Sequence, residues 1–129
     1  MLPITATYAA CLVFLFVALA ANVIRLRYGA HISLGFGDNP TLERRIRAHG
    51  NCAEYMPIGI VMIGLVEGLG APLLLVHAIG SLLLAGRLLH AFALSQSTPP
   101  LRVRVLGMVL TFSSLITASV SAIVIAWLP

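Results

Sequence analysis

Long apolar runs dominate this sequence and leave few folds open to it. Residues 4–24, 72–94 and 103–128 contain at most one charged residue each. Each run holds about the twenty residues that an α-helix needs to cross a bilayer core of ~30 Å. Because lipid offers no hydrogen-bond partners, the backbone of such a run must pair its own N–H and C=O groups, as a helix does. The sequence therefore predicts an all-α integral membrane protein.

The composition agrees with this fold class. Hydrophobic residues make up 60% of the 129 residues and charged residues 9%, whereas soluble domains are about 25% charged. The length suits a single domain over residues 1–129. The net charge of +4 comes from arginine alone and is too small and too local for a nucleic-acid-binding surface. Cys11 and Cys52 lie far apart in apolar or helical segments, so we expect neither a metal site nor a disulfide framework.

A fourth run, residues 43–69, completes a four-helix bundle but begins with charged side chains. At ~3.6 residues per turn, one face of this helix collects Arg44, Arg47, Asn51, Glu54, Tyr55 and Ile58, whereas Arg45 and His49 point elsewhere. An ionisable side chain inside a membrane costs ~2.5–3.5 kcal/mol on insertion scales, so its presence indicates function. The face offers guanidinium forks, an amide, a carboxylate and a phenol, which suits a small zwitterion. The alternative is a helix end with snorkelling arginines and an internal Arg–Glu bridge.

The loops and the arginines distinguish the two sides of the membrane. Residues 28–42 form a loop with several glycines, in which Asp38, Asn39 or Thr41 is expected to cap the next helix. Residues 95–100 form the second loop on this side. The arginines all lie near these two loops, at Arg25, Arg27, Arg44, Arg45, Arg47, Arg87, Arg102 and Arg104. The positive-inside rule therefore predicts that both loops are cytoplasmic and that both termini lie on the opposite side.

Three further features concern the helices themselves. Pro57 removes one backbone hydrogen bond and is expected to kink the second helix. Arg87 and His90 share a face of the third helix, where Arg87 either snorkels or meets an anion. Small residues recur at three- and four-residue spacing in the fourth helix, at Gly107, Thr111, Ser114, Ala118 and Ala122. They predict close helix packing, within the bundle or between subunits.

The segment Arg47–Pro57, RAHGNCAEYMP, closely resembles the signature of the MAPEG superfamily, the membrane-associated proteins in eicosanoid and glutathione metabolism. The likeness includes the order and spacing of arginine, asparagine, glutamate, tyrosine and proline at the start of the second span. Residues 37–49 and 86–91 are similar to the bacterial branch, and the length and layout agree over essentially the whole chain. The resemblance implies a homotrimer of four-helix subunits, with glutathione bound between neighbouring subunits near the cytoplasmic side.

The resemblance also implies the residues of the glutathione site. The matched contacts are Arg27, Arg47, His49, Asn51, Glu54 and Tyr55. To these we add three residues from the polar faces described above, Arg44, Arg87 and His90. Arg102 resembles the arginine proposed to hold the thiolate of glutathione, and Arg104 is the second choice because the loop alignment needs a gap.

The function that the resemblance implies is a membrane-bound glutathione-dependent transferase or peroxidase. Arginines would pair with the two carboxylates of glutathione, and Glu54 with its ammonium group. Arg102 would stabilise the thiolate, which then attacks a lipophilic electrophile or reduces a lipid hydroperoxide. Glutathione, a lipophilic small molecule, membrane lipid and the other subunits are the expected partners, in a bacterial inner membrane.

Two other functions stay open at this point. Eicosanoid-forming members of the superfamily carry tyrosines where this chain has His90 and Leu94, which argues against an eicosanoid substrate. One alternative is a non-catalytic member that binds lipid or glutathione, since some members of the superfamily bind lipids and catalyse nothing. The other is a small exporter of lipophilic cations with Glu54 as its proton and cation site. The arginines within two turns of Glu54 argue against an exporter, because they would repel a cationic substrate.

Overall fold

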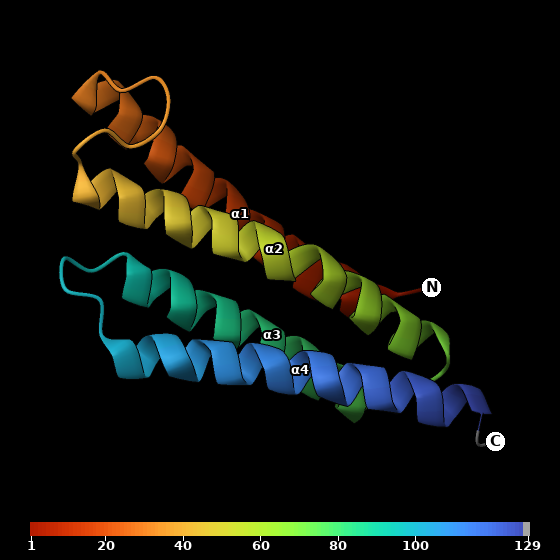
Figure 1. Ribbon diagram of the computed structural model, residues 1–129. Helices are drawn as coiled ribbons and strands as arrows, with labels where there is room; N and C mark the ends of the chain where they lie inside the picture. Colours follow the sequence, from red (N-terminus) through yellow and green to blue (C-terminus); the bar gives the residue numbers. More distant parts are fainter. Residues whose placement is uncertain (128–129) are drawn as a thin grey trace.

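Four long helices run antiparallel to their neighbours in the chain (Figure 1). The computed structural model describes residues 1–127, with α1 at Pro3–Ala30, α2 at Pro40–Gly68, α3 at Leu73–Leu94 and α4 at Leu101–Trp127. The N-terminus and the end of α4 lie at one end of the bundle, and the loops before α2 and before α4 lie at the other (Figure 1). No strand occurs among the described residues. The predicted all-α membrane bundle is confirmed.

The helix ends follow from local signals, but the predicted loop at residues 28–42 is too long, because α1 extends to Ala30 and α2 already begins at Pro40. α1 continues past Arg25 and Arg27 to Ala30, and the next residue, His31, terminates the helix with its left-handed backbone (φ 55°). At the start of α2, Asn39 is the cap, because its side-chain oxygen accepts from the N–H groups of Thr41 and Leu42 at 3.1 and 3.0 Å. The expected end of the last span, at residue 128, lies outside the described residues.

Three helices, α1, α3 and α4, are long and apolar enough to cross a membrane. The second helix, α2, has 29 residues, and at ~1.5 Å per residue it reaches ~43 Å, which also exceeds the hydrocarbon thickness. It contacts all three other helices, but its first half carries the charged face. The helix is continuous through Pro57, so the proline does not end it. A helix that contacts each of the other three thus carries half of the charged residues of the chain.

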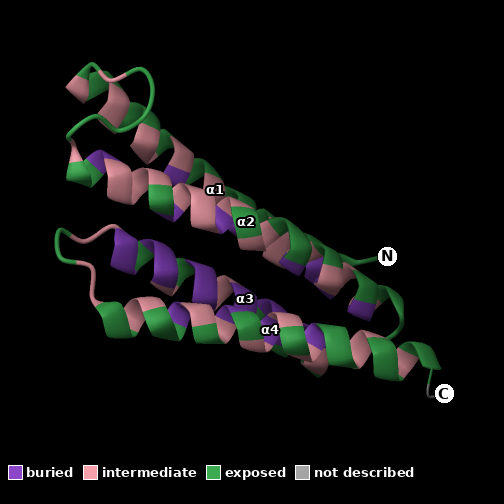
Figure 2. Ribbon diagram, viewed as in Figure 1, coloured by how far each residue is buried: buried purple, intermediate pink, exposed green. Residues whose placement is uncertain are grey.

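The core divides into two clusters along the bundle axis. Leu12, Ile63, Val66, Ile79 and Leu83 are among the residues that fill the half nearer the termini. A smaller cluster, which includes Leu19, Ala48, Cys52, Ala91 and Leu94, fills the half nearer the loops. Figure 2 shows that buried residues gather most densely on α3, while the outward faces of α1 and α4 are exposed. Those outward faces are apolar, as lipid contact requires.

The small-residue stripe of α4 packs against α3 of the same chain. Gly107, Thr111, Ser114 and Ala118 are buried there. A Cβ added to Gly107 would lie 2.8 Å from the backbone nitrogen of His90, and one added to Gly86 would lie 2.8 Å from the carbonyl oxygen of Gly107. Because those neighbours are backbone atoms, they cannot move aside for a side chain. The two helices therefore meet at nearly backbone-to-backbone distance.

At the end that carries the termini, Glu67 of α2 closes the bundle. One carboxylate oxygen accepts from the N–H of Ile4 at 3.0 Å, and the other from the N–H and the hydroxyl of Thr5 at 2.7 and 2.5 Å. The residue that precedes α1 supplies no side-chain cap. A carboxylate from the far end of α2 thus satisfies the free N–H groups of α1 and complements its helix dipole.

A charged cleft between α2, α3 and α4 as the candidate functional site

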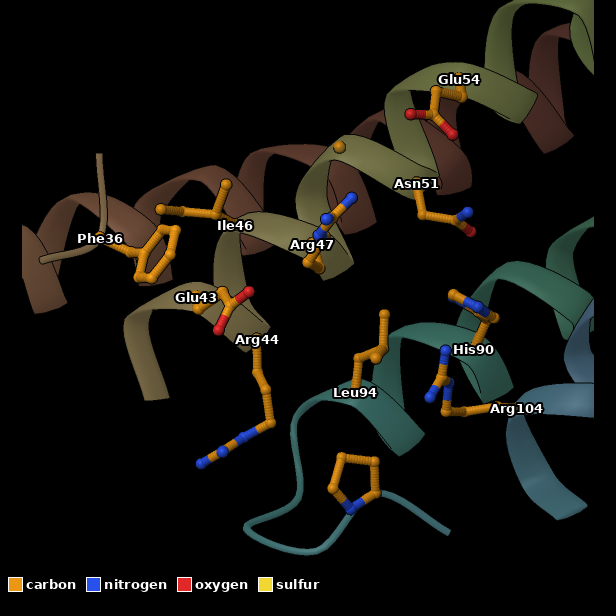
Figure 3. Close-up of a pocket in the computed structure, with 12 residues that line it drawn as sticks. Phe36, Glu43, Arg44, Ile46, Arg47, Asn51, Glu54, His90, Leu94 and Arg104 are labelled. Atoms are coloured by element: carbon orange, nitrogen blue, oxygen red, sulfur yellow. The ribbon is translucent and has the colours of Figure 1, made fainter. Parts of the chain in front are cut away.

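An open cleft of about 800 Å³ lies near the loop end of the bundle (Figure 3). Such a volume is within the range of sites that hold drug-sized ligands. The first half of α2 forms one wall, the end of α3 and the start of α4 form the other, and each of the two loops contributes one residue to the lining. The lining residues are Phe36, Glu43, Arg44, Ile46, Arg47, Gly50, Asn51, Glu54, His90, Leu94, Pro99 and Arg104. The lining thus combines three arginines, two carboxylates, an amide and an imidazole.

Helical spacing places the polar side chains of α2 together on one wall of the cleft. Arg44, Arg47, Asn51 and Glu54 recur at three- and four-residue intervals and all line the cleft, as predicted. Arg47 and Glu54 are exposed in the single chain. Among residues 1–127, no ion pair neutralises either of them. The internal Arg–Glu bridge, which was the alternative explanation for this face, is therefore not present.

The facing wall holds His90 and Arg104. The imidazole of His90 is only 6% exposed, and Arg104 lies beside it at the cleft (Figure 3). The Nε of Arg104 is buried and has no hydrogen-bond partner in the part of the chain that the structure describes. A buried donor without a partner is unfavourable and is expected to be satisfied by something that enters the site. The two walls together offer cationic donors on both sides of the cleft.

Arg87 and Tyr55 lie behind the cleft and not in its lining. The Arg87 guanidinium is 1% exposed and donates to the Thr111 hydroxyl and to the side chain of Asn51. The Tyr55 ring covers this guanidinium at 5.0 Å and meets the ring of Phe112 edge to face at 5.7 Å. These two residues support the cleft wall from inside the bundle.

Comparison with known proteins decides the family. The sequence profile of the MAPEG family matches residues 5–124, nearly the whole chain. This chain belongs to the MAPEG family. Among curated relatives, the inner membrane protein YecN of Escherichia coli strain K12 is 39% identical over 89 residues, which cover 69% of this chain and 68% of the relative. YecN of Escherichia coli O6:H1 gives the same values. The chain is accordingly an integral membrane protein of this family.

Ten residues were predicted for the site. Five of them are in the lining of this MAPEG cleft, and five lie elsewhere. The first group is Arg44, Arg47, Asn51, Glu54 and His90, and the second is Arg27, His49, Tyr55, Arg87 and Arg102. In the second group, His49 stacks on Phe16 of α1 with ring centroids 4.5 Å apart. Arg27 donates to the carbonyl of Gly35 at 2.7 Å, and Arg102 is exposed outside the cleft. Direct ligand contacts by the residues of either group stay predictions.

The cleft of this MAPEG chain also contains residues that the sequence reasoning did not single out. Glu43 and Gly50 come from α2 and continue the same face, so the spacing that found Arg47 could have found them too. Arg104 was only the second choice for the thiolate, yet it is the arginine of α4 that lines the cleft. No cluster of three potential metal ligands is found among residues 1–127.

Proposed function

We propose that this chain binds glutathione in the cleft between α2, α3 and α4, and that it activates the thiol for reaction with a lipophilic substrate. The observation that carries the proposal is the set of unneutralised charges facing one cavity: Arg47 and Glu54 without an ion pair, and Arg104 with an unpartnered buried Nε. Glutathione is a zwitterion with two carboxylates and one ammonium group. Arginines can hold the carboxylates and a glutamate can hold the ammonium group.

The proposed chemical step is stabilisation of the glutathione thiolate by a guanidinium. A free thiol with a pKa near ~8.5 is only a few per cent ionised at neutral pH. A fixed cation beside the sulfur lowers the free energy of the anion, and each unit of pKa is worth ~1.4 kcal/mol. Arg104 supports this role better than Arg102, because Arg104 lines the cleft next to His90 and Arg102 does not.

The thiolate would then attack a lipophilic electrophile or reduce a lipid hydroperoxide. Such substrates partition into the bilayer, and the outward faces of the bundle are apolar. In a conjugation, the sulfur forms the new bond to the electrophilic carbon. In a substitution the bond to the leaving group breaks and that group departs with the electron pair, and in an addition the electron pair of the activated double bond moves to the neighbouring atom, which takes up a proton. In a peroxidase reaction, two glutathione molecules are oxidised to the disulfide while the hydroperoxide is reduced to an alcohol and water. A membrane position brings either substrate to the thiolate without passage through water.

We further propose a homotrimer whose subunits share this site. Arg47 and Glu54 are exposed in the single subunit, although they belong to a bundle that sits in lipid. A neighbouring copy would cover them and remove the cost of charge in contact with lipid. It would also bring residues such as Arg27 or His49 within reach of a bound ligand. We place the protein in a bacterial inner membrane, as the name of the YecN relative suggests, with both arginine-rich loops in the cytoplasm.

One titration tests the proposed function. Glutathione is added to the detergent-solubilised protein, and binding heat and thiolate absorbance are followed in parallel. We expect binding at millimolar or lower concentration and a rise in thiolate absorbance. Arg104→Ala should abolish the rise while leaving most of the binding, and Arg102→Ala should have the smaller effect. If no heat is detected at millimolar glutathione, the proposed function is wrong.

A non-catalytic glutathione-binding protein is the second candidate. The observation that favours it is the pair His90 and Leu94 on the α3 wall, which provides no tyrosine hydroxyl to the cleft. Such a protein would give binding heat without a rise in thiolate absorbance and without consumption of an electrophile. The same titration therefore separates the two functions.

A further inference from the structure

The guanidinium of Arg87 has no N–H group left for a ligand. Its Nε and Nη2 donate to the Thr111 hydroxyl at 3.0 and 2.6 Å, and Nη2 also approaches the sulfur of Met108 at 3.4 Å. Its Nη1 donates to the side-chain oxygen of Asn51 at 2.7 Å and approaches the Asn51 carbonyl oxygen at 3.4 Å. A guanidinium has five N–H groups, and these contacts account for all of them. Arg87 is therefore placed to act on its neighbours and not on a bound molecule.

The guanidinium is also held in one position. The hydroxyl of Thr111 donates its own hydrogen to the carbonyl of Gly107 at 2.8 Å, so its oxygen can only accept from Arg87. The Tyr55 ring covers the guanidinium at 5.0 Å. Thr111 is fully buried and Arg87 nearly so. The donors of Arg87 thus point in fixed directions, and one of these directions is toward Asn51.

This arrangement decides which way the amide of Asn51 faces. A guanidinium only donates hydrogen bonds, so the amide atom next to it must be the oxygen and not the nitrogen. The NH₂ group is left on the other side of the amide. Asn51 lines the cleft, and its side chain extends from α2 toward the wall that holds His90 (Figure 3). Within residues 1–127, this NH₂ group has no hydrogen-bond acceptor.

We propose that Arg87 is a positioning residue that fixes the Asn51 amide with its NH₂ group directed into the cleft, so that Asn51 recognises a carboxylate of the ligand. The inference rests on the proposed function and names the part of glutathione that Asn51 contacts. A carboxylate fits better than a peptide carbonyl, because the hydrogen-bond partners of Arg87 are all neutral and its positive charge remains behind the amide. The opposite amide orientation would present an oxygen and would reject a carboxylate.

The first test compares acid and amide forms of the ligand. Affinities are measured for glutathione and for its two analogues in which either the glycyl or the γ-glutamyl carboxylate is an amide. The wild type should bind glutathione at least tenfold more tightly than the analogue in which the carboxylate recognised by Asn51 is an amide. Arg87→Gln and Thr111→Val should reduce that preference to below threefold, because the Asn51 amide is then free to turn. Thr111→Ser keeps the hydroxyl and should retain the preference.

A purely structural role for Arg87 or Thr111 would lower stability but would leave the ratio of acid to amide affinities unchanged. An unchanged ratio in folded Arg87→Gln and Thr111→Val would overturn the positioning role while the proposed function stands. Asn51→Asp adds a further arm, because its carboxylate would pair with Arg87 and present no donor. Glutathione affinity should then fall at least tenfold, and retained affinity would count against the inference.

The second test does not depend on glutathione. The chain has three asparagines, Asn22, Asn39 and Asn51, so ¹⁵N-asparagine labelling gives few side-chain NH₂ signals to assign. Acetate serves as the carboxylate probe. It should shift the NH₂ signal of Asn51 in the wild type and shift it much less in Arg87→Gln, whereas ammonium chloride should shift it in neither. If acetate leaves the wild-type signal in place, the inference is wrong. A shift with acetate in a protein that does not bind glutathione would support the inference and refute the proposed function.

Discussion

Two glutamates of α2 lie in opposite situations. Glu67, near the end with the termini, accepts three hydrogen bonds from Ile4 and Thr5 of α1. Glu54, about halfway along the helix, is exposed at the cleft and has no partner among residues 1–127. Both are acids within a membrane protein, where an uncompensated charge is costly. A carboxylate whose partners come from its own chain stabilises the fold, whereas one without partners is available to a ligand.

The largest expected effect is on ligand binding through Glu54. Glu54→Gln keeps the shape of the side chain but removes the charge that would hold the ammonium group of glutathione. A hydrogen bond to a charged group contributes ~1.5–3 kcal/mol, so the affinity for glutathione should fall about ten- to a hundredfold. Isothermal titration measures this, and the thermal unfolding midpoint should not decrease. A lower unfolding midpoint with unchanged glutathione affinity would show that Glu54 stabilises the fold, as Glu67 does, and does not bind the ligand.

The complementary change at Glu67 should affect stability and not binding. Glu67→Gln removes the charge that complements the dipole of α1, and it replaces one acceptor oxygen by an NH₂ group beside the N–H donors of Ile4 and Thr5. The thermal unfolding midpoint in detergent should fall by a few degrees, while glutathione affinity stays within about twofold. Thr5→Val tests the same contact from α1 and should lower the midpoint less. A loss of binding in Glu67→Gln would break the contrast between the two acids.

A smaller effect is expected from filling the cleft next to Glu54. A Cβ added to Gly50 meets no atom within 4 Å, and Gly50 lines the cleft. Gly50→Leu should therefore fold normally, gain up to ~1 kcal/mol from helix propensity, and lower glutathione affinity by about fivefold through lost space. Gly29→Leu in α1 is the matched control, because its Cβ also meets nothing within 4 Å and it lies outside the cleft. Equal affinities of the two variants would place the ligand elsewhere.

The smallest effect should come from a polar contact at the surface. Arg25 donates to the side chain of Asn22 at 3.2 Å within α1, at an exposed position outside the cleft. Arg25→Ala should change the free energy of unfolding by no more than about 0.5 kcal/mol and leave glutathione affinity unchanged. Chemical unfolding and the same titration measure the two quantities. A large change in either quantity would show that any charge near the loops affects stability or glutathione binding, whether or not it lies in the cleft.

The sequence predicted the elements that local periodicity controls. Four helices, their approximate bounds and the face of Arg44, Arg47, Asn51 and Glu54 follow from apolar runs and helical spacing. The small residues of α4 were predicted to pack closely, and the structure places that contact against α3. These features depend only on residues a few positions apart.

Features that depend on contacts between distant segments could not be predicted in this way. The bond between Glu67 and Thr5 joins residues 62 positions apart, and nothing near Glu67 in the sequence indicates it. The choice between Arg102 and Arg104 depends on how α4 is rotated about its axis after the second loop, which spacing within α4 does not determine. For Arg87, helical position predicted a snorkelling side chain or an anion contact. Its actual partners on α2 and α4 depend on how three helices meet.

The close approach of Gly86 and Gly107 limits how the cleft can change its width. The α3–α4 contact is the most extensive in the bundle and the α1–α2 contact is the next. Since backbone atoms of α3 and α4 already touch near His90, this wall behaves as a single stiff block. A change in the width of the cleft is therefore expected to come from a tilt of the α1–α2 pair, and the turn that follows α2, with Gly70 at φ 82°, is the natural pivot.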